Sequence, residues 1–252
     1  MSKPIKAIVL AAGKGKRLRT EGVDLPKVLR LAAGKPLLGY VLEELSFIPR
    51  QDTVLVVGYE GEKVIAAFPG YPKVHQSPQL GTGHAVQCAE GMLKGFEGNI
   101  LICCGDMPLL PRRAYEQLAR QHEEEGNACT LMAAVADKPV AMGRIVRNAE
   151  GGFARIVEDQ DCTEEEKKIC ELNAGLYIFD ARSLWRALTT LRPNNAQGEY
   201  YLTDAPVWLV KQGEKVGVSA ACTAQEMLGV NTVEQLQEVE RIVAQRERDA
   251  AQ

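Results

Sequence analysis

The chain has 252 residues, of which 46% are hydrophobic and 25% charged, so it is long enough to bury the core of one large α/β domain or two small ones. Its formal net charge of −3 argues against nucleic-acid binding through bulk electrostatics, because domains that bind in that way carry a basic face. Seven cysteines without a Cys-x-x-Cys pair, beside three histidines, argue against a disulfide framework and against a structural zinc site. The sequence shows neither a signal-peptide pattern nor an apolar run near the ~20 residues that span a bilayer, and we expect a cytoplasmic protein without a membrane partner.

The first apolar run, at residues 7–10, leads into a small, glycine-rich and basic loop. Such a run is typical of a buried parallel strand, and glycines at its end let backbone N–H groups approach a phosphate or a base edge. Lys14, Lys16 and Arg17, with Lys27 beyond the loop, add cations that can hold a polyphosphate. The sequence therefore predicts a nucleotide site at the start of the chain.

Other interpretations of this loop are weaker. Its glycine spacing lacks the second half of a Walker A motif, and Leu18 stands where a dinucleotide fingerprint has its third glycine. The remaining alternative is a turn in which the glycines are needed only for steric reasons and the lysines are exposed to solvent without binding a ligand.

The middle of the chain alternates strand and helix patterns. We expect strands at residues 7–10, 53–57, 100–104, 129–135 and 176–179, with helices at 37–46, 84–93 and 112–125. This alternation predicts an α/β fold with right-handed crossovers and a largely parallel, doubly wound sheet. Ligands bind such sheets beyond the carboxyl ends of the strands, which is where the first loop lies.

A turn at residues 76–83 leads into the helix expected at 84–93. The Gln76 amide offers a donor and an acceptor, which suits the edge of a pyrimidine, and Thr82 adds a hydroxyl. Gly81 and Gly83 make the backbone available to a planar ligand. We interpret His84 as a structural hydrogen-bonding histidine rather than as a general base.

Gly105 and Asp106 follow the strand expected at 100–104. A carboxylate at this edge of a sheet is a typical Mg²⁺ ligand, because Mg²⁺ takes one or two protein carboxylates together with substrate phosphate oxygens. A turn or helix-capping aspartate is the alternative. No pattern of an activated nucleophile is present, which fits a reaction whose nucleophile is an already ionised phosphate oxygen.

The pattern changes after about Lys138. Residues 143–158 resemble a strand–turn–strand unit, and the charged stretch at 159–168 is expected to be a loop or an exposed helix. Helices are expected near 182–191 and 204–212. The segment 232–248 has the apolar stripe of an amphipathic helix, with Thr232 and Gln235 as a capping box.

These motifs resemble the pyrophosphorylase domain of the GlmU-type N-acetylglucosamine-1-phosphate uridylyltransferases, within the sugar-nucleotidyltransferase family. The resemblance spans nearly the whole chain, and its most specific segment is the run Asn-Asn-Ala-Gln-Gly-Glu-Tyr-Tyr-Leu-Thr-Asp at 194–204. It implies a three-layer, Rossmann-like α/β fold with a mixed, mainly parallel sheet. It also implies a nucleotidyltransferase domain at 1–231 and a C-terminal amphipathic helix and tail at 232–252.

The resemblance assigns roles to individual residues. It implies that the nucleotide is held by Leu10, Ala11, Ala12, Gly13, Gln76, Gly81, Thr82 and Gly105. It implies that Arg17 and Lys27 are catalytic, holding the phosphates, and that Asp106 and Asn231 are the protein ligands of Mg²⁺. The sugar would be bound by Gly143, Glu158, Asn173, Tyr201 and Thr203.

The implied reaction joins UTP and N-acetylglucosamine-1-phosphate into UDP-N-acetylglucosamine and pyrophosphate, with no nucleic-acid partner. A uridylyl- or thymidylyltransferase for another sugar-1-phosphate, such as glucose-1-phosphate, is the alternative within this chemistry. A non-catalytic nucleotide-sugar binding protein is the alternative outside it. The bifunctional members also carry hexapeptide repeats with acetyltransferase activity, and without such repeats in this sequence we expect no acetyltransferase activity.

Three positions and one segment depart from the family pattern. Lys16 stands where threonine is common, and the segment 18–24 is longer than usual. Cys104 replaces an aromatic residue, and Ala174 replaces the usual threonine. We expect these differences to alter fine positioning and the closure of the triphosphate loop rather than the reaction.

Overall fold

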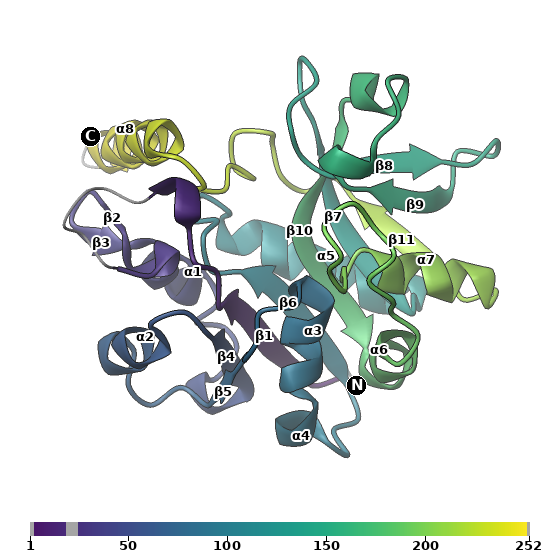
Figure 1. Ribbon diagram of the computed structural model, residues 1–252, viewed down its shortest axis with the longest axis horizontal. Coiled ribbons are helices and arrows are strands. Elements are labelled where there is room, and N and C mark those ends of the chain that lie inside the picture. The colour runs from purple at the N-terminus through teal and green to yellow at the C-terminus, as the bar shows by residue number, and fades with distance from the viewer. Residues whose placement is uncertain (1–2, 19–24, 251–252) are drawn as a thin grey trace.

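A computed structural model describes residues 3–18 and 25–250, built around one twisted sheet (Figure 1). The strands follow the order β11-β7-β10-β6-β1-β4-β5. Their bounds are β1 Ile5–Ala11, β4 Thr53–Val57, β5 Lys73–His75, β6 Asn99–Cys104, β7 Cys129–Val135, β10 Glu171–Asp180 and β11 Val216–Ser219. β1 is parallel to β4 and β6, β4 to β5, and β7 to β11, whereas β10 is antiparallel to β6 and β7. The expected mixed, mainly parallel sheet is confirmed.

Helices cover both faces of this sheet. In β1, Ala7 and Val9 pack into one apolar cluster and Ile8 into the other, as the period of two in a strand requires. The first cluster is covered by α1 Leu37–Glu44, α2 Gly61–Ala67 and α5 Arg112–Glu125. The second is covered by α3 Thr82–Cys88, α4 Glu90–Leu93, α6 Ala181–Leu188 and α7 Asp204–Lys211. The three-layer α/β fold is therefore confirmed.

The register of the sheet places the functional loops side by side. Leu10 pairs with Cys104 of β6 and with Val56 of β4. The loop after β1 and the Gly105-Asp106 turn after β6 consequently leave the same edge as neighbours. The backbone N–H of Gly105 donates to the carbonyl of Leu10 at 2.9 Å and so joins the two loops directly.

Of three local expectations, one differs from the structure and two agree with it. The helix expected at 84–93 is divided into α3 and α4 at Ala89, whose N–H donates to Val86 three residues earlier instead of continuing the helix. The charged stretch forms two short 3₁₀ turns, at Asp159–Asp161 and Glu166–Lys168. The strand–turn–strand unit is confirmed as β8 Arg144–Arg147 and β9 Phe153–Val157, which extends the sheet from β10.

Smaller elements that the sequence did not predict complete the part of the chain described. They are the ribbon of β2 Leu31–Ala32 and β3 Lys35–Pro36, and the 3₁₀ turns Lys16–Leu18, Lys27–Leu29 and Arg50–Asp52. Within residues 3–18 and 25–250, no helix combines the length and the apolar character that crossing a membrane requires.

The last helix, α8 Val233–Ala250, packs on the loops of the first third of the chain, next to β2 and β3 (Figure 1). Its Val239 and Ile242 share an apolar cluster with Leu18, at the end of the first loop. The capping box is confirmed: the Gln235 N–H donates to Thr232 Oγ1 at 3.3 Å, and the Thr232 N–H donates to Gln235 Oε1 at 3.1 Å. The cap therefore secures the start of a helix that supports the first loop.

Replacing Thr232 by alanine removes the hydroxyl acceptor of this cap, and we expect Thr232→Ala to lower the free energy of unfolding by about 1 kcal/mol. Urea denaturation measures the loss. Thr232→Ser keeps the hydroxyl and serves as the matched control. Equal stability of the alanine and serine variants would contradict the contribution of the cap.

Candidate functional site

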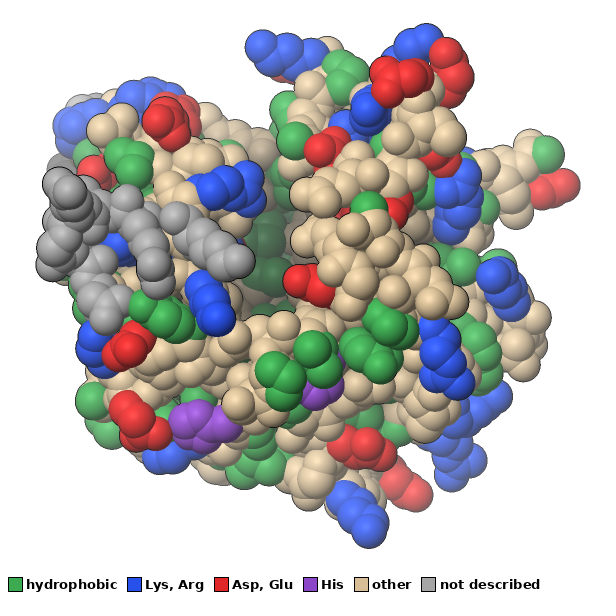
Figure 2. All heavy atoms as spheres, in the orientation of Figure 1, with side chains coloured by type: hydrophobic (Ala, Val, Ile, Leu, Met, Phe, Trp, Pro, Cys, Tyr) green, Lys and Arg blue, Asp and Glu red, His purple; other side chains and the backbone are tan. Residues whose placement is uncertain are grey.

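Two adjoining cavities open at the carboxyl edge of the sheet. Figure 2 shows the hollow that they form between the two halves of the molecule. The first has a volume of about 490 Å³ and the second of about 290 Å³. Both are lined by Leu10, Thr82, Cys104, Asp106 and Asn231. The shared residues make the two cavities one site with two compartments.

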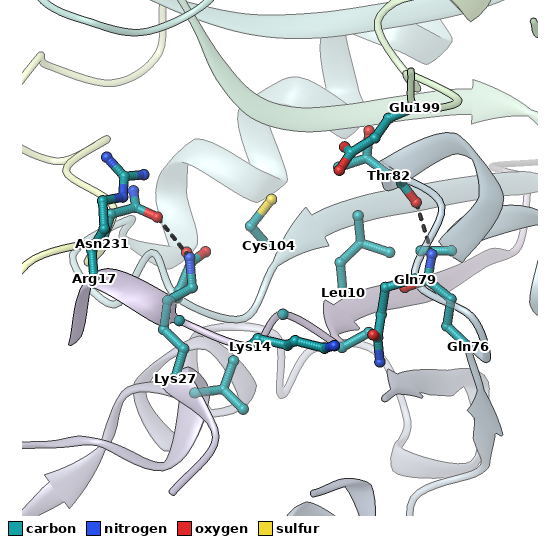
Figure 3. A pocket seen from close by; sticks show the side chains of 17 residues that line it. Leu10, Lys14, Arg17, Lys27, Gln76, Gln79, Thr82, Cys104, Glu199 and Asn231 are labelled. Carbon is teal, nitrogen blue, oxygen red and sulfur yellow. Dashed lines mark hydrogen bonds and ion pairs between the residues drawn. The ribbon is translucent and has the colours of Figure 1, made fainter. Parts of the chain in front are cut away.

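The first cavity gathers most of the residues predicted to bind nucleotide and metal (Figure 3). They are Leu10, Ala12, Gly13, Arg17, Lys27, Gln76, Gly81, Thr82, Asp106 and Asn231. Two predicted residues do not line it. Ala11 is only 1% exposed and points into the core, and Gly105 packs against Leu10, Val28 and Leu38. Their nucleotide contacts remain predictions.

A single ammonium group joins the predicted metal ligands. Lys27 Nζ forms an ion pair with the Asp106 carboxylate and donates to Asn231 Oδ1 at 2.8 Å. Figure 3 shows the Lys27 and Asn231 side chains meeting close to Arg17. The carboxylate and the amide oxygen already hold a cation between them, and hard oxygen donors of this kind are the ligands that Mg²⁺ prefers.

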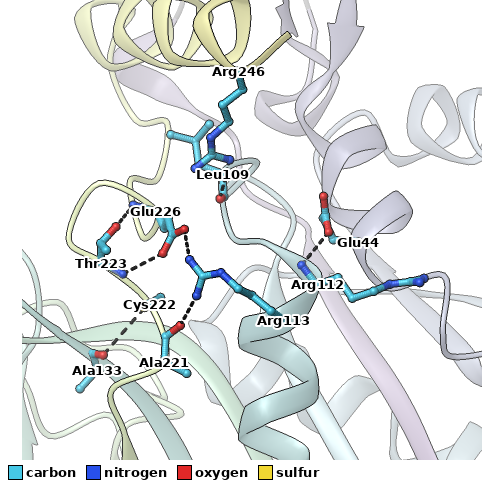
Figure 4. A network of polar contacts seen from close by, with 10 residues as sticks. All are labelled: Glu44, Leu109, Arg112, Arg113, Ala133, Ala221, Cys222, Thr223, Glu226 and Arg246. Atoms are coloured by element: carbon cyan, nitrogen blue, oxygen red, sulfur yellow. Dashed lines mark hydrogen bonds and ion pairs between the residues drawn. The ribbon is translucent and has the colours of Figure 1, made fainter. Parts of the chain in front are cut away.

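The backbone around Asn231 is held from three directions. The Val230 N–H donates to the carbonyl of Asp106 at 3.0 Å, and the Asn231 N–H donates to Gln235 Oε1 at 2.7 Å. Farther back, Arg113 of α5 pairs with Glu226 and donates to the Ala221 carbonyl at 2.8 Å (Figure 4). The segment that carries Asn231 is therefore attached to α5, to the β6 loop and to the cap of α8.

The turn at 80–83 is joined to the segment at 200–202. The Gly83 N–H donates to the Tyr200 carbonyl at 2.7 Å, and the Tyr200 N–H donates to the Leu80 carbonyl at 2.8 Å. Thr82 Oγ1 accepts from the Leu202 N–H at 3.0 Å. Gly81 has φ +110°, and a Cβ there would lie 2.6 Å from the Tyr200 carbonyl oxygen, so this close approach requires glycine.

The second cavity collects the predicted sugar-binding residues Gly143, Glu158, Asn173 and Thr203. Thr203 Oγ1 donates to Glu158 Oε1 at 3.2 Å, and the Asn173 N–H donates to the Gly143 carbonyl at 2.8 Å. Burial raises the pKa of the Glu158 carboxyl, against the lowering effect of the Thr203 hydrogen bond. Tyr201 lines neither cavity, so its contact with the sugar remains a prediction.

The wall of the second cavity is held by a buried cation. Arg144 of β8 pairs with Asp159 and donates to the Met142 carbonyl. Asn173 Nδ2 donates to the Tyr177 hydroxyl at 2.6 Å, so one amide hydrogen is used within the protein. Thr203 donates to the other oxygen of Glu158, Oε1. No donor from residues 3–18 and 25–250 contacts Oε2, which is therefore available to a ligand hydroxyl.

Other residues line the site although they were not assigned to it. Gln79 and Glu199 lie in the first cavity, and both belong to motifs that carry the resemblance. Met142 and Leu228 line the second cavity from segments without a distinctive pattern. Cys104 lies at the junction, where burial raises the pKa of its thiol to about 12. Residues 19–24, where the loop is longer than the family pattern, lie outside the described residues.

Known proteins resemble this chain along most of its length. Proteins named bifunctional protein GlmU are 40% identical over 243 residues in Clostridium acetobutylicum and 43% identical over 242 residues in Clostridium beijerinckii. Each alignment covers 95% of this chain and 52% of the relative, so the chain spans about half the length of the curated relatives it matches.

A crystal structure assigned as a glucose-1-phosphate thymidylyltransferase of Bacillus anthracis, in complex with a sucrose, superimposes with a TM-score of 0.73. It is 19% identical and covers 94% of both chains, which shows a shared fold. The MobA-like NTP transferase domain family matches residues 7–204, a range that contains most of β1, the first loop, Asp106 and the 194–204 run. By this match, the chain belongs to the MobA-like NTP transferase domain family.

Proposed function

We propose that this nucleotidyltransferase transfers a uridylyl group from UTP to N-acetylglucosamine-1-phosphate, forming UDP-N-acetylglucosamine and pyrophosphate. The observation that carries the proposal is the pair of adjoining cavities that share Asp106 and Asn231. One is lined by cations and glycines, and the other by carboxylate, amide and hydroxyl groups. The GlmU relatives support the same assignment, at 40% and 43% identity over 95% of the chain.

In the proposed reaction, the negatively charged phosphates of both substrates lie where the two cavities meet. A phosphate oxygen of the sugar-1-phosphate attacks the α-phosphorus of UTP, and the bond from that phosphorus to the bridging oxygen of the leaving pyrophosphate breaks. Because the attacking oxygen is already ionised, no side chain has to remove a proton. Arg17 and Lys27 stabilise the negative charge of the departing pyrophosphate, so catalysis consists of alignment and electrostatic stabilisation.

Asp106 and Asn231 are the residues that would hold Mg²⁺. The donor set fits the ion, since it supplies one carboxylate and one amide oxygen and leaves further positions to substrate phosphates. The Lys27 ammonium already bridges these two oxygens, so it acts as a stand-in cation. Bound Mg²⁺ supplies charge neutralisation of the polyphosphate. With Mg²⁺ held at this position, Lys27 would lose its pair with Asp106, and the phosphates of a bound nucleotide would offer it new partners.

The direct test is a panel of sugar-1-phosphates assayed for pyrophosphate release with UTP and with dTTP. We expect the highest kcat/KM for N-acetylglucosamine-1-phosphate with UTP, because the second cavity offers amide and hydroxyl partners for an N-acetyl sugar. Strong turnover of glucose-1-phosphate together with none of N-acetylglucosamine-1-phosphate would contradict the proposed substrate. Nucleotide binding without any pyrophosphate release would contradict the proposed reaction.

Removing the carboxylate at Asp106 tests the metal assignment. We expect Asp106→Ala to lower kcat at saturating Mg²⁺ on the order of 100-fold, as loss of one group that stabilises transition-state charge does. Glu90→Ala, at an exposed position of α4, is the control for loss of a carboxylate elsewhere. A kcat for Asp106→Ala equal to that of the control would show that Asp106 does not support the reaction.

Removing the ammonium at Lys27 tests whether it competes with the metal. We expect nucleotide-free Lys27→Met protein to bind Mn²⁺ about ten-fold more tightly than the native protein, because a unit charge at this range repels a divalent ion by more than 1 kcal/mol even in water. Electron paramagnetic resonance of free Mn²⁺ measures the affinity. Weaker Mn²⁺ binding by Lys27→Met would instead mean that Lys27 holds the two ligands in place.

A further inference from the structure

We propose that His84 is a positioning residue that sets the orientation of the Gln76 side-chain amide and thereby contributes to a preference for uracil over cytosine. The inference rests on the proposed function, in which the first cavity holds the uridine of UTP. It concerns a residue that sequence analysis interpreted as structural only. The chain of contacts that supports it runs from Gly81 through Gln76 to His84 and Cys88.

The orientation of the Gln76 amide follows from its partners. Gln76 lines the first cavity and is 4% exposed, and its side-chain Nε2 lies 2.8 Å from the carbonyl oxygen of Gly81. A backbone carbonyl can only accept, so the Gln76 atom at this distance must be the nitrogen. One amide hydrogen is thereby assigned to Gly81.

The second amide hydrogen meets the imidazole. Gln76 Nε2 lies 3.2 Å from His84 Nδ1, and because Nε2 is a donor, Nδ1 has to accept. The ring proton is then on Nε2 of His84, which lies 3.9 Å from the Cys88 sulfur, a weak acceptor. The opposite tautomer would set N–H against N–H. The ring also lies beside Tyr200, with a centroid separation of 6.5 Å.

These contacts determine what Gln76 can offer a base. Both hydrogens of its amide are used within the protein, and no donor from residues 3–18 and 25–250 contacts Oε1. A ligand must therefore present a donor to this oxygen. Uracil carries N–H at N3, whereas cytosine carries a lone pair there. Turning the amide to suit cytosine would bring Oε1 against the Gly81 carbonyl, and it would require His84 to move its ring proton to Nδ1 and give up its contact with the Cys88 sulfur.

Two substitutions separate the acceptor of His84 from the bulk of its ring. His84→Phe keeps a ring beside Tyr200 but has no acceptor, and His84→Asn loses the ring but places an amide oxygen near the position of Nδ1. The measurement is kcat/KM for UTP and for CTP with N-acetylglucosamine-1-phosphate. We expect His84→Phe to lower the UTP-to-CTP ratio about 3- to 10-fold, the effect of one hydrogen bond, and His84→Asn to keep the ratio near that of the native protein.

A purely structural role would lower turnover of both nucleotides together and leave their ratio unchanged, so an unchanged ratio in His84→Phe would overturn the inference. A ratio that falls in His84→Asn but not in His84→Phe would overturn it as well, in favour of ring packing. Thermal unfolding checks that each variant is folded, and His84→Leu replaces the phenylalanine variant if that one is not.

A separate measurement distinguishes failure of this inference from failure of the proposed function. Equilibrium binding of UTP and CTP to the native protein without sugar measures the base preference directly. Binding that favours UTP, with no turnover of N-acetylglucosamine-1-phosphate, would refute the proposed reaction, and the His84 variants would then be judged by the ratio of their binding constants. Equal binding of UTP and CTP by the native protein would overturn the inference itself.

Discussion

The functional edge of the molecule depends on the contact of one ammonium with one carboxylate and one amide oxygen. Lys27 belongs to the 3₁₀ turn Lys27–Leu29, Asp106 to the turn after β6 and Asn231 to the segment before α8. A largely buried carboxylate such as that of Asp106 is costly without a counter-charge, so the pair with Lys27 is also a reason for these three segments to meet. Three further contacts hold Asn231 toward Asp106. They come from Arg113, from the Val230 N–H and from the cap of α8.

The walls of the two cavities are joined to each other by hydrogen bonds. The 80–83 turn and the 200–202 segment exchange backbone hydrogen bonds, and the Thr82 hydroxyl accepts from Leu202. Thr82 itself lines both cavities. Hydrogen bonds therefore join the wall of the first cavity directly to the wall of the second cavity. If the proposed reaction depends on alignment, this connection would help to hold its two substrates in a fixed relative position.

The sequence predicts best what is local and strongly patterned. Strands β1, β4, β6 and β7 are continuous apolar runs because they are buried on both faces, and the capping box of α8 depends on residues three apart. The edge strands β5 and β11 escape prediction because they are short and half-exposed, and tertiary pairing alone makes them strands. Asp106 and Gln76 follow from motif chemistry, whereas the contact of Lys27 with Asn231 spans 204 residues and has no local signal.

The donors and acceptors that the protein leaves without a partner determine which ligand groups the site can bind. Gln76 donates both of its amide hydrogens to groups of the protein, and its Oε1 can still accept a hydrogen bond. Glu158 accepts from Thr203 with one carboxylate oxygen, and its other oxygen can accept from a ligand. Both compartments therefore require donors, such as an imide N–H in one and a sugar hydroxyl in the other. Lys27 and Arg17 also line the first cavity, and their positive charges suit a ligand with phosphates. A neutral, donor-bearing base and a hydroxylated sugar joined through phosphates satisfy all of these demands at once, whereas a base with acceptors alone at this edge leaves buried groups unpaired, at a cost of about 1–3 kcal/mol each.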